Sequence, residues 1–372
     1  MLFLSRIAIF ACMKLHIFNP DHDMALASNL QVFTAPHAAR QLQSDLEYLP
    51  ALWADEGDLV LVENVDNARD KMRHLAGVAG RKHVQFITPD QLASAFKASF
   101  LVDSIHPWGW NKALCFKLQR LGCPKIMLPT TSVLQRLRQI SSRQWAASHL
   151  QQDVKFVDNV AALEHMMLTE GGVVIKAPWS CSGRGVRFYN AENNSAVCQD
   201  TLRWAQNVIA KQGGVTVEPY YNKVKDFGME FEMFDGHVHY LGLSLFNTSN
   251  TAYSGNLLAT EDAKEKIISR YIPVTQLQVI RQYVIDVMEP ALKGMYNGAF
   301  GVDMMICTRN SSSKEILVNP CIEVNLRRTM GHLALALSKN VSDCQCAMQI
   351  AYTGNRYHLN VRKLNVNDED IV

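Results

Sequence analysis

The sequence predicts a protein that is α/β in its first part and α+β in the parts that follow. Through residues 15–100, short apolar runs alternate with helical runs, as in a parallel sheet covered by helices on both faces. Further along, apolar runs follow one another across polar loops, as in antiparallel sheets. With 372 residues, 48% of them hydrophobic, the chain can supply two domains with cores of their own.

The elements of the first part follow from the spacing of apolar residues. Leu42, Leu46 and Leu49 recur at helical spacing, and Thr88-Pro89 is a typical helix start. We expect strands at 15–18, 58–62 and 84–87, and helices at 35–53, 68–78, 90–100, 112–121 and 132–150. Because this part has no glycine fingerprint, no dinucleotide is assigned to it.

Three polar residues, Asp21, His22 and Asp23, follow the first strand. In open α/β sheets, ligands bind at the carboxyl ends of the strands, so these side chains are candidates for substrate contact or proton transfer. The alternative is a turn and a helix cap, which Asp forms readily.

Acids on two later strands form the most informative pattern in the chain. Glu323 and Asn325 are two residues apart and therefore point to one face of their strand, while Asp303 lies in the apolar strand 298–306. A polar loop at 308–314 would join the strands as a hairpin and let the acids meet. Such oxygen ligands suit Mg²⁺, and Arg327 and Arg328 suit phosphate or carboxylate. The alternative places both acids on the solvent face of the sheet.

A strand ending at Lys176 is followed by the small-residue loop 180–185, and a second strand, 214–218, ends at Glu218. A buried ammonium is costly unless it meets an anion, and a loop of this kind can bring N–H groups to phosphate oxygens. An ordinary hairpin turn is the alternative for the loop. The run 226–234 alternates apolar and acidic residues, as an amphipathic strand does.

In chain order, four of these segments resemble the ATP-grasp superfamily: the Lys176 strand with its loop, the strand that ends at Glu218, the Asp303 strand, and the strand with Glu323 and Asn325. The metal triad is similar to that of D-alanine–D-alanine ligase. The resemblance covers residues 141–331. It implies an ATP-grasp fold preceded by a Rossmann-like (pre-ATP-grasp) domain. The implied divisions are an N-terminal Rossmann-like domain at 13–140, a lid subdomain at 141–222, a C-terminal subdomain with the metal site at 223–350, and a tail at 351–372.

The resemblance also implies roles for individual residues. Lys176 and Arg327 are the implied catalytic residues, and Arg143 stands where the family has a lysine. Nucleotide contacts are implied for Arg143, Lys176, Ser182, Gly183, Gly185, Val217, Glu218 and Asp226, and Mg²⁺ ligands for Asp303, Glu323 and Asn325. Separately from the resemblance, residues 245–256 are expected to form a long polar loop that offers Tyr253 and Asn256 to a substrate, with Arg328 as a further contact.

The implied activity is that of an ATP-dependent ligase with ATP and Mg²⁺ as cofactors. It would activate a carboxylate as an acyl phosphate for attack by an amine or a related nucleophile. Two alternatives stay open. One is a phosphotransferase on the same scaffold, and the other is a nucleotide-binding protein without catalysis. The expected partner is a small-molecule or peptide carboxylate, with a homodimer as one option for assembly.

Composition narrows the function classes further. The net charge is +2 without a basic stripe, which argues against nucleic acid, and no apolar run approaches the roughly 20 residues that cross a bilayer. The nine cysteines show no metal spacing, which indicates a reducing cytoplasm. The first 13 residues lack the basic start of an export signal, so export is disfavoured, and both Met1 and Met13 stay open as the start.

Overall fold

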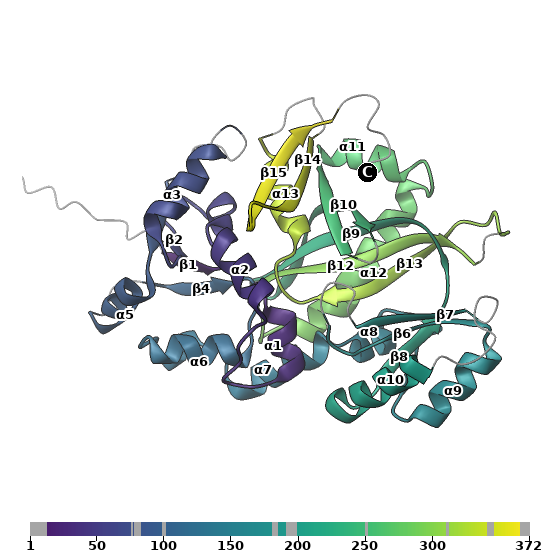
Figure 1. Ribbon diagram of the computed structural model, residues 1–372. Coiled ribbons are helices and arrows are strands. Elements are labelled where there is room, and N and C mark those ends of the chain that lie inside the picture. The colour runs from purple at the N-terminus through teal and green to yellow at the C-terminus, as the bar shows by residue number, and fades with distance from the viewer. Residues whose placement is uncertain are drawn as a thin grey trace, which may run out of the picture.

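The computed structural model describes residues 13–75, 77, 83–98, 102–180, 185–190, 199–249, 252–309, 312–340 and 346–364 (Figure 1). Within these residues the strands form a four-stranded, a seven-stranded and a second four-stranded sheet. The mixture of one parallel and two antiparallel sheets confirms the fold class that the sequence predicts.

The first sheet is parallel and has the strand order β3-β2-β1-β4. Its strands are β1 (Lys14–Ile17), β2 (Leu59–Leu61), β3 (Gln85–Ile87) and β4 (Ser104–Pro107). The helices of this part are α1 (His22–Ser28), α2 (His37–Leu46), η1 (Leu49–Leu52), α3 (Val65–His74), α5 (Pro89–Lys97), α6 (Lys112–Arg120) and η2 (Lys125–Met127). Thr88 and Gln91 form the capping box that begins α5.

Two expected helices are each divided. The expected helix 35–53 is α2 followed by the short 3₁₀ helix η1, because Pro50 cannot continue an α-helix. The expected helix 132–150 is α7 (Thr131–Ile140) and α8 (Arg143–His149), where the Ser142 hydroxyl accepts a hydrogen bond from the Trp145 N–H. This break places Arg143 at the first position of α8.

The second sheet is antiparallel and lies below β12 and β13 in Figure 1. Its order is β5-β8-β6-β7, from β5 (Lys155–Val157), β6 (Gly172–Lys176), β7 (Val186–Asn190) and β8 (Val215–Pro219). Two helices, α9 (Val160–Thr169) and α10 (Gln199–Gln212), pack on it through a shared core that includes Leu163, Ile175 and Ala205. The strand that ends at Lys176 is therefore held rigidly from one side.

The third sheet has the order β13-β12-β9-β10-β11-β14-β15. Its strands are β9 (Asn222–Phe234), β10 (His237–Ser249), β11 (Ala252–Leu258), β12 (Gly298–Thr308), β13 (Leu317–Asn325), β14 (Cys346–Thr353) and β15 (Arg356–Lys363), accompanied by α11 (Glu261–Ile268), α12 (Val274–Leu292) and α13 (Met330–Ser338). Helix α12 buries Leu277, Ile280 and Val284 in the same core as Phe231 and Phe300 of the sheet.

A separate core connects the first sheet to the third. Leu333 and Leu337 of α13 pack in one cluster with Leu46, Leu49 and Trp108 of the N-terminal part. The segment that follows β13 is thereby fixed against the end of the parallel sheet. This contact brings residues near 20 and residues near 325 together.

Two expectations about late segments are corrected. Residues 245–249 and 252–256, expected as parts of a loop, belong to β10 and β11, in which Phe246 pairs with Asn256. Residues 351–363, expected as part of a tail, form the end of β14 and all of β15 in the seven-stranded sheet. The domain boundaries at residues 140, 222 and 350 stay predictions.

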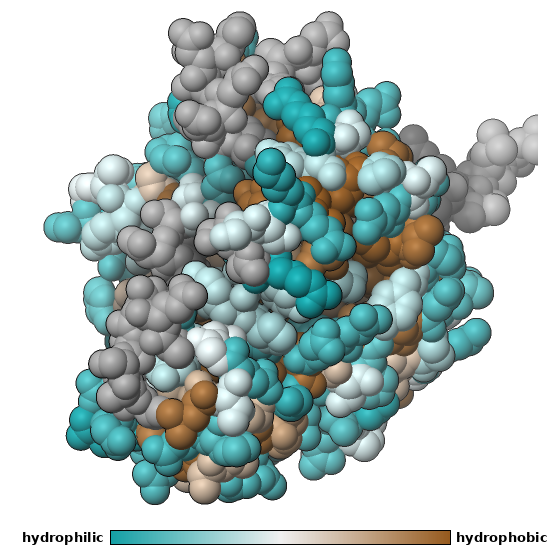
Figure 2. All heavy atoms as spheres, turned by 90° about the vertical axis from the view of Figure 1, so that its right-hand side faces the viewer, coloured by the Kyte–Doolittle hydropathy of each residue, from teal (hydrophilic) through white to brown (hydrophobic). Residues whose placement is uncertain are grey.

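The outer surface is mixed in character. Figure 2 shows the face on the right of Figure 1, where hydrophilic residues cover much of the surface and hydrophobic residues gather mainly in its upper part. Within the described ranges, no helix is both long enough and apolar enough to span a membrane.

Candidate active site

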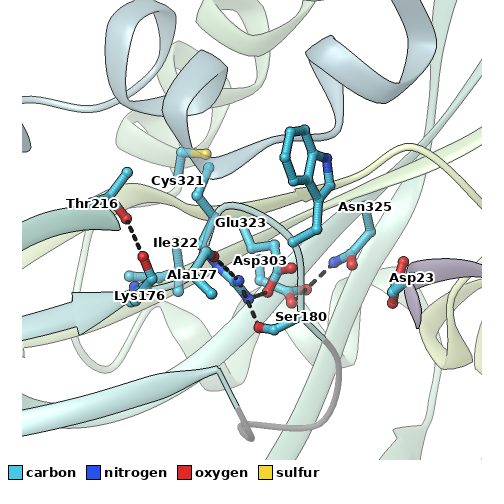
Figure 3. A network of polar contacts seen from close by, with 12 residues as sticks. Asp23, Lys176, Ala177, Ser180, Thr216, Asp303, Cys321, Ile322, Glu323 and Asn325 are labelled. Atoms are coloured by element: carbon cyan, nitrogen blue, oxygen red, sulfur yellow. Dashed lines mark hydrogen bonds and ion pairs between the residues drawn. The ribbon is translucent and has the colours of Figure 1, made fainter. Parts of the chain in front are cut away.

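The acids of β12 and β13 lie directly opposite each other. Asp303 pairs with Glu323 and Gly301 with Asn325 in the antiparallel register, and the Asn325 side-chain amide donates to Asp303 Oδ2 at 3.1 Å. Like charges directly opposite each other destabilise a sheet, so this pair is costly for folding alone. In Figure 3, Asp303, Glu323 and Asn325 gather at one place beside the end of β6.

The charge of Asp303 is poorly compensated. Burial, then the carboxylates of Glu323 and Glu230, raise the pKa of Asp303 to about 7, although Arg327 and the Asn325 amide act in the opposite direction. A cation at this position would keep the carboxylate ionised.

The two carboxylates are hard ligands that fit Mg²⁺, which proteins often hold with one or two carboxylates and substrate phosphates. The Asn325 amide turns its nitrogen to Asp303 and its oxygen to Arg327 Nη2. Among the described residues, no group of three or more His, Cys, Asp or Glu side chains could hold a metal ion by itself. The donor set thus fits a metal ion that a bound phosphate helps to ligate.

Arg143 connects the second sheet to these acids. Its Nη1 donates to the Ala177 carbonyl and the Ser180 hydroxyl, both at 2.7 Å, and its Nη2 donates to Glu323 Oε2 at 2.7 Å (Figure 3). The side chain is buried, with a relative exposure of 7%. Arg143 was expected near the nucleotide because of its place in the sequence, and its position links the loop after β6 with Glu323.

Lys176 and Glu218 form a buried ion pair between β6 and β8. The strand register places Val174 opposite Glu218 and Ile175 opposite Val217, which is itself buried. The side chain that was expected to meet an anion therefore meets one supplied by the chain itself. A nucleotide phosphate would have to share Lys176 with Glu218.

Arg327 joins the acids to the first part of the chain. Its Nε donates to Asp23 Oδ1 at 2.9 Å, and its Nη2 donates to Asp23 Oδ2 and to Asn325 Oδ1, each at 2.8 Å. Burial opposes the charge of Arg327, but Asp23 outweighs it and raises its pKa. Burial would raise the pKa of Asp23, yet the guanidinium lowers it overall.

Asp21 and His22 lie beside this ion pair but do not share it. The His22 ring is buried against Gly109, where a Cβ atom would be 2.5 Å from the ring, and lies 3.3 Å from the Asn111 amide nitrogen. Burial lowers the pKa of His22 to about 4, so the ring is neutral at pH 7. Asp21 stands at the start of α1, and its carboxylate does not cap the helix.

The expected substrate residues outside this region are occupied elsewhere. The Tyr253 hydroxyl donates to Asn256 Oδ1 at 2.5 Å, and the Asn256 amide donates to the Ser244 hydroxyl at 2.8 Å, so both are bound within the β10–β11 region instead of being free in a loop. The Arg328 guanidinium lies 5.1 Å from the centre of the Trp53 ring, whereas the Arg327 guanidinium binds Asp23. The loop expectation for Tyr253 and Asn256 is therefore wrong.

The remaining nucleotide candidates have mixed outcomes. Asp226 Oδ2 accepts hydrogen bonds from Lys223 Nζ at 2.8 Å and from the Thr248 hydroxyl at 2.7 Å. Neighbouring side chains therefore hold this carboxylate on the third sheet. Gly185 accepts the Ala177 N–H at 2.8 Å, next to the start of β7. Ser182 and Gly183 lie outside the described residues.

Sequence reasoning missed a third acid on the same sheet face as Asp303 and Glu323. Glu230 of β9 is buried, lies 2.9 Å from His332 Nδ1, and occupies space that a Cβ atom on either Gly301 or Gly331 would fill. His332 belongs to the capping box that Thr329 forms at the start of α13. The alternation of acids in 226–234 was a usable signal, but it did not reveal which acid is buried.

Comparison with known proteins finds solved structures of similar fold but no protein of similar sequence. No family model matches the sequence, and no curated protein matches it. Among solved structures, N5-carboxyaminoimidazole synthetase from Staphylococcus aureus, complexed with ADP, is similar at 14% identity with a TM-score of 0.51, over 92% of this chain and 83% of that one.

Two further structures are similar at lower scores. Biotin carboxylase from Campylobacter jejuni is 13% identical with a TM-score of 0.49, over 91% of this chain and 75% of that one. A putative ATP-grasp superfamily protein from Archaeoglobus fulgidus is 12% identical with a TM-score of 0.41, over 95% of this chain and all of the other (100%). The arrangement of sheets, together with the first of these likenesses, shows that the chain has the ATP-grasp fold expected from its sequence.

Proposed function

We propose that the protein is an ATP-dependent ligase that activates a carboxylate as an acyl phosphate and transfers the acyl group to an amine. The observation that carries the proposal is the facing pair Asp303 and Glu323, which is held to the loop after β6 by Arg143. Facing carboxylates are unfavourable unless a cation joins them, and Mg²⁺ with a nucleotide phosphate is the cation that suits two such ligands. The fold agrees with this reading, and a similar structure is a complex with ADP.

The nucleotide would lie between the second and third sheets. Lys176 and Arg143 supply fixed positive charge at one side, and Asp303 and Glu323 supply the metal ligands at the other. Bound Mg²⁺ would neutralise charge on the phosphate oxygens. The residues of the chain need only orient the phosphates, since phosphoryl transfer depends mainly on positioning and electrostatic stabilisation.

The reaction would have two steps. In the first, an oxygen of the substrate carboxylate bonds to the γ-phosphorus, the bond to the β,γ-bridging oxygen breaks, and ADP leaves. In the second, the amine nitrogen bonds to the acyl carbon, phosphate leaves, and the amine loses a proton. Arg327, held by Asp23 and Asn325, would orient the carboxylate and stabilise the transferred group with charge-assisted hydrogen bonds.

The test is ADP release from Mg·ATP with pools of carboxylates and amines supplied separately and together. The ligase predicts rapid ADP release only when both pools are present, along with a condensed product detectable by mass spectrometry. Release with carboxylates alone, with a stable phosphorylated product, would identify a phosphotransferase instead. Binding of ATP without turnover under any combination would leave a nucleotide-binding protein. The matched control is Arg69→Gln, which changes an exposed residue of α3 and should behave as the wild type.

A further inference from the structure

A cavity of about 490 Å³ lies at the carboxyl edge of the parallel sheet. It is lined by the ends of β1 and β2, by the segment 31–35 and by α6, with Leu61, Leu114 and Leu118 among its buried apolar lining. Its volume is in the range of sites for small molecules. None of the residues assigned above to the nucleotide or the metal lines it.

The cavity occupies the position in the sheet where ligands bind in open α/β folds. Strand β1 has β2 on one side and β4 on the other, so the chain order reverses beside β1. Ligands bind outside the carboxyl ends of strands at such a reversal. The two loops there are fastened together, because the Asn19 amide donates to the Gly109 carbonyl at 2.9 Å and accepts from the Gly109 N–H at 3.3 Å. The cavity is therefore built on a rigid frame.

Most charged groups of the lining are arranged by sign, with Glu63 as the exception among the exposed ones. Asp21 is half-buried in the wall, and within the described ranges no hydrogen bond joins its carboxylate to another side chain. Arg40, Lys117 and Arg120 are exposed residues of the same lining and so stand at the mouth. Lys117 has only a loose ion pair, 3.8 Å from the exposed Glu63. The lining thus offers the carboxylates of Asp21 and Glu47 inside, of which Glu47 already accepts the N–H groups of Glu63 and Asn64. Three cationic side chains and the exposed Glu63 stand outside, with an apolar floor between the two groups.

The wall of the cavity is also close to the candidate active site. Asp21 lines the cavity, and Asp23 binds Arg327. Two residues of chain span at most about 7 Å between their Cα atoms. The Cα atom of Asp21 in the cavity wall is therefore no more than about 7 Å from that of Asp23, which holds Arg327.

We infer that this cavity binds the amine substrate, and that this substrate is a free amino acid with an apolar side chain. Its ammonium group would face Asp21, its carboxylate would meet Arg40 and Lys117, and its side chain would cover Leu61 and Leu118. The role of acceptor rests on the proposed ligase function, but the binding of the amino acid does not.

The binding test uses isothermal titration calorimetry of the full chain without ATP, with L-leucine, L-phenylalanine, L-methionine and L-valine as probes. At least one probe should bind, and the analogue of the best probe that lacks either the amine or the carboxylate should bind about tenfold or more weakly. If none of the four binds at millimolar concentration, or if the single-function analogues bind equally well, the inference is wrong.

Variants locate the site. Asp21→Asn keeps the shape of the side chain and should weaken binding about tenfold, Lys117→Gln should weaken it by a smaller factor, and Ala113→Trp should fill the cavity and abolish binding. Arg69→Gln should bind as the wild type, and the melting temperature of each variant shows whether it is folded. Unchanged binding in folded Asp21→Asn would overturn the assignment. Normal binding combined with absent ATP turnover would refute the ligase function while leaving the cavity as an amino-acid site.

Discussion

Two buried groups of charges, one on the second sheet and one on the third, are balanced in opposite ways. Lys176 and Glu218 are one cation and one anion in direct contact, each with a relative side-chain exposure of 8%. Asp303 and Glu323 are two anions in facing positions, and the pKa of Asp303 is raised to about 7 by burial and by its acidic neighbours. The first group is a one-to-one ion pair, whereas in the second only Glu323 has an ion pair, with Arg143, and among the described residues none is formed by Asp303. This uncompensated charge is the reason that we propose the metal ion on the third sheet.

The largest expected effect follows from breaking the one-to-one ion pair. Lys176→Ala leaves the Glu218 carboxylate buried without its partner, so the free energy of unfolding should fall by about 3–5 kcal/mol. Urea denaturation of the purified variant measures this loss. The structure thus changes what the sequence suggested, because a lysine expected to serve only the nucleotide is also part of the core.

A double variant controls for this effect. Lys176→Met combined with Glu218→Leu replaces both charges by apolar side chains and should recover most of the lost stability. Its affinity for Mg·ATP should stay low if Lys176 contacts the phosphates. A double variant as stable as the wild type and with unchanged ATP affinity would remove Lys176 from the nucleotide site.

A smaller effect on stability is expected for the acidic pair. Glu323→Gln removes one of the two facing charges but also takes the ion partner from the buried Arg143, while keeping an acceptor for Arg143 Nη2. Because these effects oppose each other, the melting temperature should fall less than in Lys176→Ala. Turnover should nevertheless fall by about two powers of ten, since a group that holds charge in the transition state is lost. ADP release and melting of the same sample measure both quantities. Wild-type turnover in this variant would end the metal assignment for Glu323.

The sequence predicted the acidic site better than the basic one for a physical reason. Asp303 and Glu323 lie on neighbouring strands of a hairpin, and their meeting follows from strand alternation and a short loop. The contact of Lys176 with Glu218 depends on the register of strands that are far apart in sequence, and no local pattern determines it. The reach of Arg143 across to Glu323 likewise depends on how the second sheet sits on the third.

Local composition also misled at one place. Asn247, Thr248 and Ser249 are typical of turns, which favoured a loop at 245–256. In the structure they continue β10, because pairing with β11 satisfies the backbone whatever the side chains prefer. The helices of the first part were easier, since their apolar spacing and caps are local, and only Pro50 and the Ser141–Ser142 break divided them.

The raised pKa of Asp303 should also make the free energy of unfolding depend on pH. The pKa of Asp303 in the folded protein, about 7, is above the ordinary value of 3.8 that applies to the unfolded chain. The folded state therefore favours the protonated acid, and this contribution to stability is complete below pH 3.8 and lost as the pH rises to about 7. Relative to Asp303→Asn, the wild type should lose unfolding free energy between pH 4 and pH 7 and change little above it.

Mg²⁺ provides the check on that pH profile. Because only the ionised carboxylate binds a metal ion well, added Mg²⁺ with ATP should raise the melting temperature of the wild type more at pH 8 than at pH 5. Asp303→Asn should show a smaller difference between the two pH values. Equal stabilisation of the wild type at both would contradict a metal ion on Asp303.

The smallest expected effect tests how tightly the acidic face is packed. A Cβ atom on Gly301 would lie 2.5 Å from Glu230 Oε2 and 2.8 Å from Thr329 Cγ2, whereas one on Gly228 would meet nothing closer than the Val302 carbonyl oxygen at 3.3 Å. Gly301→Ala should therefore cost about 1–3 kcal/mol of unfolding free energy, and Gly228→Ala should cost less. Since Glu230 raises the pKa of Asp303, displacing its carboxylate should also move the pH midpoint of the wild-type profile. Equal stabilities of the two alanine variants would show that the Glu230 side chain has room to move, and that its closeness to Asp303 is not imposed by the packing of β12.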